Sequence, residues 1–82
     1  MNQQQHIQIN PDIMMGKPII KGTRITVELI LRKLSEGTPI HDLLEAYPHL
    51  KIDDIHAAMA YAADTLSHEE TLSFDINSPT HV

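Results

Sequence analysis

Hydrophobic residues in the first third of the chain recur with a period of two, which is typical of β-strands. Ile7-Gln8-Ile9 alternates, and the β-branched runs 19–20 and 24–27 flank the sequence Lys21-Gly22-Thr23. Glycine readily adopts the positive φ that a tight turn needs, and Pro18 has no N–H to donate to a sheet. The pattern therefore predicts a β-hairpin closed at Gly22, with an edge strand that begins near Pro18.

The hydrophobic period changes to 3.6 residues after this segment, which indicates an amphipathic helix. Thr26 is expected to be its N-cap, and Gly37 its C-terminal limit. The apolar stripe of this first helix is Val27, Ile30, Leu31 and Leu34.

Two more helices are expected to follow. The second has Thr38 as its N-cap and Pro39 at its first position, and it stops before Pro48. The third begins at residue 51 or 52 and ends near residue 66, and its alanines favour helix. Their apolar stripes are Ile40, Leu43, Leu44 and Tyr47 in the second helix and Ile52, Ile55, Met59 and Leu66 in the third.

These elements predict a mainly α protein with a small β segment. An N-terminal β-hairpin is followed by a three-helix, helix-turn-helix-like bundle. We expect residues 1–6 to be a flexible N-terminus, residues 7–66 to be the single β-hairpin and tri-helical domain, and residues 67–82 to be a C-terminal tail that is partly flexible or binds a partner. The candidate partner-binding residues of the tail are Leu72, Phe74 and Ile76.

Composition excludes several classes of protein. The 82 residues include no cysteine, so neither a disulfide framework nor a cysteine-based zinc site is available, and a reducing cytoplasmic location is expected. We find no apolar run near the roughly 20 residues that span a bilayer, and no secretion signal at the start. A core this small contributes about 3–5 kcal/mol, so a partner is expected to add stability.

Charge is distributed unevenly along the chain. Five of the six Lys and Arg residues precede Leu34, whereas nine of the eleven Asp and Glu residues follow it. Such asymmetry fits either a nucleic-acid-facing end or ordinary solvated surface. The two halves are therefore expected to face different partners.

Several separated motifs recur in order along the chain, and the most specific of them is Gly16-Lys17-Pro18-Ile19-Ile20-Lys21-Gly22-Thr23-Arg24-Ile25-Thr26-Val27. Together these motifs closely resemble the bacterial family catalogued as domain of unknown function 433, and the resemblance covers about residues 7–66. That family is similar in fold to homeodomain-like and winged-helix-like proteins, and many members look like VapB-like antitoxins encoded beside a PIN-like ribonuclease toxin. The family motif implies structural roles for Pro11, Gly16, Pro18, Gly22, Thr23, Arg24, Gly37, Tyr47, Pro48, Ala58 and Tyr61.

Two positions depart from the family pattern. Met15 stands where members often carry Gly or Ser, and Lys51 stands where Ser or Thr usually caps the third helix. The lost hydroxyl cap costs about 1 kcal/mol, partly offset by Asp53 and Asp54 near the helix start. We expect Met14, Met15 and Met59 to fill gaps in a core with few aromatic residues.

Promoter DNA is a possible ligand of the basic first third. The third helix would enter the major groove in a helix-turn-helix protein, but its expected exposed positions (Asp53, Asp54, His56, Ala57, Ala60 and Asp64) are small or acidic and would be repelled by phosphates. The candidate DNA-binding residues are therefore Lys17, Lys21, Arg24, Arg32 and Lys33. A dimer would be needed to double this modest footprint, and local ion pairing of the same residues is an equally acceptable explanation.

No catalytic or metal motif is complete. In His68-Glu69-Glu70-Thr71-Leu72, leucine replaces the second histidine of a zinc protease motif, and Asp53 with His56 is better explained as ordinary helix surface. There is no phosphate-binding loop and no nucleophile motif. We therefore expect no enzyme activity, no metal and no cofactor.

Two hypotheses remain. The first is a non-catalytic antitoxin that occludes a PIN-like ribonuclease toxin and also binds its own promoter as a dimer. The second is a stand-alone structural or regulatory homodimer without a toxin. An edge strand at residues 7–9 and a small core favour dimerisation in either case.

Overall fold

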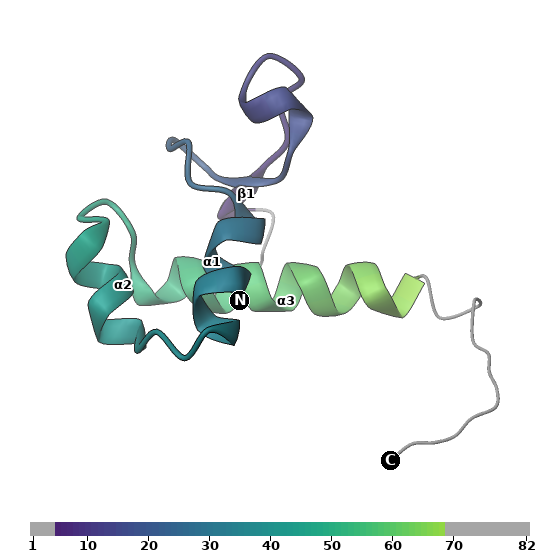
Figure 1. The fold of residues 1–82 in the computed structure, drawn as a ribbon. Coiled ribbons are helices and arrows are strands. Elements are labelled where there is room, and N and C mark those ends of the chain that lie inside the picture. The colour runs from purple at the N-terminus through teal and green to yellow at the C-terminus, as the bar shows by residue number, and fades with distance from the viewer. Residues whose placement is uncertain (1–4, 69–82) are drawn as a thin grey trace, which may run out of the picture.

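The computed structural model describes residues 5–68. Its elements are β1 (Ile7–Gln8), the 3₁₀ helix η2 (Met14–Gly16), β2 (Ile19–Ile20), α1 (Val27–Ser35), α2 (Ile40–Ala46) and α3 (Ile52–His68), as Figure 1 shows. The small β segment lies over the start of α1, and α1 crosses α3. This confirms the predicted fold class of three helices after a short antiparallel β segment.

The β segment pairs strands that are farther apart in sequence than predicted. β1 is antiparallel to β2, with Ile7 opposite Ile20. The expected partner of β2, residues 24–27, forms only an isolated bridge between Ile19 and Thr26, because the chain enters α1 at once. The tight turn itself is confirmed: the Thr23 N–H donates to the Ile20 carbonyl at 3.0 Å, and Gly22 has a φ of 81°.

Each helix begins in a different way. Thr26 caps α1 as predicted, since its hydroxyl oxygen accepts a 3.0 Å hydrogen bond from the Leu29 N–H. Thr38 does not cap α2, because that helix starts one residue later than expected, with Pro39 at the N-cap and no side-chain cap. At the start of α3, Asp54 takes over the capping role: its Oδ2 accepts a 2.9 Å hydrogen bond from the Lys51 N–H.

The hydrophobic core lies where the β segment, α1, α2 and α3 meet. Helix α1 packs against α3, which contributes the fully buried alanines Ala57 and Ala58. Tyr47 and Tyr61 are half-buried at the edge of this core. The buried apolar residues are Ile19, Ile20, Val27, Ile30, Leu43, Leu50, Ile55, Ala57 and Ala58.

The predicted apolar stripe of α3 is largely wrong. Of its four members only Ile55 is buried, whereas Ile52, Met59 and Leu66 are exposed. The buried face instead combines Ile55 with alanines, which a search for large side chains does not detect. Met14, Met15 and Met59 are likewise exposed and fill no gap in the core. Within residues 5–68, no helix is long and apolar enough to cross a membrane.

Candidate functional site

The turn after β2 is fixed by one threonine side chain. The Thr23 hydroxyl donates to the Ile20 carbonyl at 2.8 Å and accepts from the Ile25 N–H at 2.9 Å. In addition, the Ile20 N–H donates to the Ile25 carbonyl at 2.8 Å. These bonds hold the backbone on both sides of Arg24, so the turn presents this exposed arginine on a rigid base.

A second motif lies at the end of α2. The Tyr47 N–H donates to the Leu43 carbonyl, and the Tyr47 carbonyl accepts a 2.8 Å hydrogen bond from the Leu50 N–H. Pro48 has no N–H and ends the helix. Tyr47 is therefore half-buried against the core, whereas Pro48 and His49 are exposed beside it.

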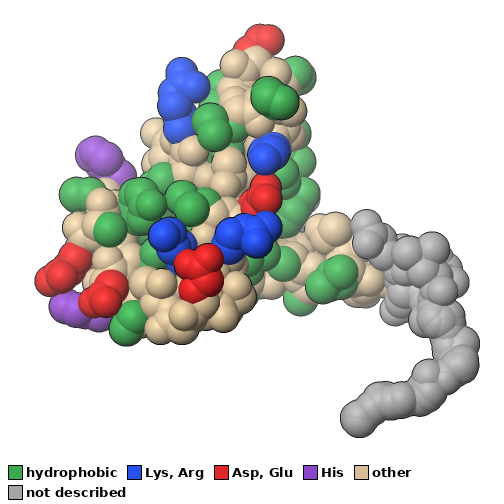
Figure 2. Space-filling model, viewed as in Figure 1, with side chains coloured by type: hydrophobic (Ala, Val, Ile, Leu, Met, Phe, Trp, Pro, Cys, Tyr) green, Lys and Arg blue, Asp and Glu red, His purple; other side chains and the backbone are tan. Residues whose placement is uncertain are grey.

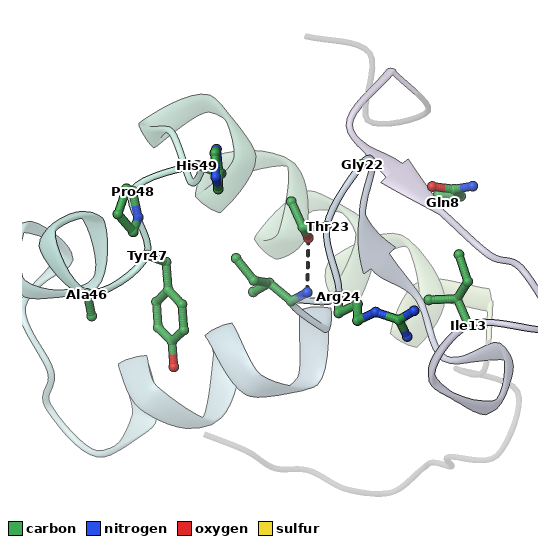
Figure 3. Close-up of a pocket in the computed structure, with 10 residues that line it drawn as sticks. Gln8, Ile13, Gly22, Thr23, Arg24, Ala46, Tyr47, Pro48 and His49 are labelled. Carbon is green, nitrogen blue, oxygen red and sulfur yellow. Dashed lines mark hydrogen bonds between the residues drawn. The ribbon is translucent and has the colours of Figure 1, made fainter.

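The two motifs face each other across an open groove of about 700 Å³, which we call the motif groove. In Figure 3, Tyr47, Pro48 and His49 lie on one side of it, and the Arg24 side chain extends toward Ile13 on the other. Five of the residues assigned to the family motif contribute to it: Gly22, Thr23, Arg24, Tyr47 and Pro48. The remaining lining residues are Gln8, Ile13, Ile25, Ala46 and His49, none of which the sequence identified as site residues.

The mainly apolar motif groove carries one arginine in a protein whose formal net charge is -5. Arg24 makes no ion pair within the described residues, and the described lining includes no carboxylate. Lys21, in the same turn, is also exposed and forms no ion pair with residues 5–68. An apolar groove with one uncompensated guanidinium favours a ligand that carries both apolar groups and a carboxylate or phosphate.

The other candidate DNA-binding residues lie elsewhere. Lys17 and Arg32 converge on Glu28, at 3.1 Å and 3.5 Å respectively. The hydrogen bond and charge of Lys17, followed by those of Arg32, lower the pKa of Glu28. Lys33 is half-buried on α1. Figure 2 shows the resulting surface, on which basic and acidic side chains lie next to one another.

The acidic face expected on α3 is only partly exposed. Asp53, His56, Ala60 and Asp64 reach solvent as expected. Asp54 is 8% exposed and Ala57 is fully buried, which corrects their assignment to the surface. The reason is tertiary: Oδ1 of Asp54 lies 2.8 Å from Nδ1 of His6, which the fold places over the start of α3. An Asp three positions after an N-cap is a capping signal that the sequence contained.

Three potential metal ligands lie close together on α2. Single ligand atoms of His41, Asp42 and Glu45 lie within 4.8 Å of one another, and all three residues are exposed. His41 Nε2 already contacts Glu45 Oε2 at 3.2 Å. Surface groups at helical spacing commonly form such pairs, so this cluster is explained without an ion.

The remaining residues of the family motif support the fold and do not line the motif groove. Pro11 approaches Gly16 in the loop around η2, and the Pro18 carbonyl accepts a 2.9 Å hydrogen bond from the Val27 N–H. Gly37 follows the end of α1 with a φ of 89°. Ala58 is fully buried, and Tyr61 packs against the core. The tail residues Leu72, Phe74 and Ile76 lie outside the described residues.

Comparison with known proteins identifies the family to which these motifs belong. The sequence pattern of the family described as "Protein of unknown function (DUF433)" matches residues 7–62. The uncharacterized protein y4eO of Sinorhizobium fredii is 36% identical over 53 residues, which are 65% of this chain but only 24% of that protein, so the chain spans about a quarter of its length.

A solved structure supports the same relationship. The crystal structure of a DUF433 member from Anabaena variabilis superimposes with a TM-score of 0.73 and 34% sequence identity, and the match covers 79% of this chain and 64% of that chain. The β-turn and tyrosine motifs that form the groove both fall within the matched residues 7–62. The chain therefore belongs to the DUF433 family of proteins of unknown function.

Proposed function

We propose that this protein is a non-catalytic, antitoxin-like module that binds and inhibits a PIN-like ribonuclease toxin through the motif groove. The observation that carries the proposal is the exposed Arg24, which has no ion pair within the described residues and lines a groove whose described lining holds no carboxylate. A ribonuclease of this kind is expected to hold its metal with clustered carboxylates, which a guanidinium binds through paired hydrogen bonds.

The proposed mechanism is occlusion of the toxin's active site. Arg24 contacts the carboxylates, while Tyr47 and Pro48 provide a hydrophobic contact surface around that ion pair. Aromatic and arginine side chains are the residue types that most often dominate the binding energy of protein interfaces. The rigid turn held by Thr23 lowers the entropic cost of binding.

A direct test uses the product of the neighbouring reading frame as the candidate toxin. The two proteins are co-purified, and RNA cleavage by the toxin is measured with increasing amounts of this protein. We expect the unaltered protein to suppress cleavage. Removing a charge that is buried at an interface costs at least about 2 kcal/mol, so Arg24→Ala should weaken inhibition at least about thirtyfold.

Arg32→Ala is the matched control, because Arg32 is also an exposed arginine but lies outside the motif groove, beside Glu28. It should inhibit as strongly as the unaltered protein. Full RNA cleavage in a stable excess of this protein would exclude the antitoxin function. Equal losses for both arginine variants would exclude the motif groove as the binding site.

A further inference from the structure

A second groove runs between α1 and the C-terminal half of α3, and we call it the α1–α3 groove. Its volume is about 530 Å³, and apolar side chains from both helices line it, including Leu31, Tyr61, Ala62 and Leu66. Leu66 is 66% exposed, so a large apolar side chain is uncovered at the end of this groove. Figure 1 shows that this half of α3 extends beyond its crossing with α1.

The groove lies at the point from which the rest of the chain departs. Helix α3 is described to His68, two residues after Leu66, and 14 further residues follow in the sequence. Among them Leu72, Phe74 and Ile76 alternate with Ser73 and Asp75. In an extended segment, a period of two places the three apolar side chains on one face.

We propose that residues 72–76 of this chain turn back after α3 and occupy its own α1–α3 groove. The connecting segment is long enough for the chain to turn back, because the four residue steps from His68 to Leu72 reach up to about 14 Å. The lengths also agree. Five extended residues span about 13 Å, and the α1 residues that line the groove, from Val27 to Ser35, rise about 12 Å.

Charge favours the same occupant. Arg32 lines the α1–α3 groove and approaches Glu28 through one guanidinium nitrogen at 3.5 Å. A guanidinium has five N–H donors, so Arg32 retains donors for a second carboxylate. Asp75 alternates with the apolar residues and so lies on the solvent-facing side of the docked segment, where it brings a carboxylate to the rim of the groove without burying it.

The docked segment would cover Leu66 and add the largest apolar side chain of the tail to a core that has few aromatic residues. Phe74 is the single phenylalanine of the protein, and burial of an aromatic side chain removes about 150–250 Å² from water. In this arrangement the apolar residues of the tail bind within the chain itself and not to a separate partner.

The single phenylalanine also provides a clean probe. With 4-fluorophenylalanine incorporated, the full-length protein gives one ¹⁹F resonance, from position 74. We expect this resonance to be displaced from its position in urea-unfolded protein. Ala62→Glu, which places a charge in the groove, should return it to the unfolded position. Ala60→Glu is the matched control, because Ala60 is exposed on the same helix and does not line the groove.

A second variant guards against misfolding of Ala62→Glu. Leu72→Asp combined with Ile76→Asp changes no residue of the described fold, so helical circular dichroism should persist while the ¹⁹F displacement is lost. A resonance at the unfolded position in the unaltered protein would overturn the proposal. So would a displacement that survives Ala62→Glu in folded protein, or one that appears only at concentrations where light scattering detects a dimer, which would identify a second copy as the occupant.

Discussion

Nδ1 of His6 lies 2.8 Å from Oδ1 of Asp54, and the other oxygen of the same carboxylate accepts the Lys51 N–H at 2.9 Å. Because a carboxylate only accepts, Nδ1 of His6 carries the proton of their hydrogen bond. Asp54 thus joins the residue before β1 to the first turn of α3. It also satisfies the backbone N–H of Lys51 at the start of that helix.

Asp54→Ala should lower the free energy of unfolding by about 2 kcal/mol, because two hydrogen bonds worth about 1 kcal/mol each are lost. In a domain of this size that corresponds to a decrease in Tm of roughly 8–16 °C. Asp53→Ala is the control, since Asp53 is exposed in the same helical turn. Thermal unfolding followed by circular dichroism measures both, and similar losses would contradict the capping role.

The contribution of His6 can be separated by a double-mutant cycle with His6→Ala and Asp54→Ala. Groups in direct contact have coupling energies of at least about 0.5 kcal/mol, so we expect a value near 1 kcal/mol at pH 7. Urea unfolding of the four proteins gives this value. A coupling near zero would mean that the contact adds nothing to stability.

Two threonines that look alike in the sequence should respond differently to the same substitution. Thr26→Ala removes the cap of α1 and should cost about 1 kcal/mol. Thr38→Ala should change stability by less than about 0.5 kcal/mol, because α2 has no side-chain cap. Chemical denaturation compares them, and the reverse order would show that the α2 start is assigned wrongly.

Met15 is a site at which the native residue is unfavourable. Its φ is 57°, in the left-handed region, and its side chain is 88% exposed, so no burial compensates the backbone strain. A left-handed backbone costs a non-glycine residue about 1–2 kcal/mol. Substitution by glycine removes this cost, but up to about 1 kcal/mol of the stabilisation is lost because glycine raises the conformational entropy of the unfolded chain. Met15→Gly should therefore raise Tm by a few degrees, whereas Met15→Ala, which keeps the Cβ atom, should not.

Glu28 should make stability depend on pH. Its pKa in the folded protein is lowered from the ordinary value of 4.5, chiefly by Lys17 and then by Arg32. A lowered pKa stabilises the fold above the unfolded-state pKa, and this contribution is lost as the pH falls through the folded-state pKa. The Tm deficit of Glu28→Gln at pH 7 should thus vanish well below pH 4.5 and shrink in 1 M salt. Glu36→Gln, outside this cluster, should show neither trend.

Sequence motifs predict some residues of the candidate site but not how these residues come together. The sequence motifs include Arg24, Tyr47 and Pro48, but nothing local indicates that residues 22–25 and 46–49 share a groove. Nothing in the sequence around His49 or Gln8 marks either residue as part of a site. Conversely, Lys17 and Arg32 are basic residues of the type that contacts nucleic acids, and only the fold shows that both lie against Glu28.

The sequence by itself determined those features that depend on neighbours along the chain. The three helices, the Thr26 cap and the turn at Gly22 rest on side chains and backbone groups within a few residues of one another. Only the tertiary structure decided which strand pairs with β2 and which face of α3 is buried. An alanine-rich helix has no strong apolar stripe of its own, so its buried face is set by the elements that approach it, through Ala58 and through the contact of Asp54 with His6.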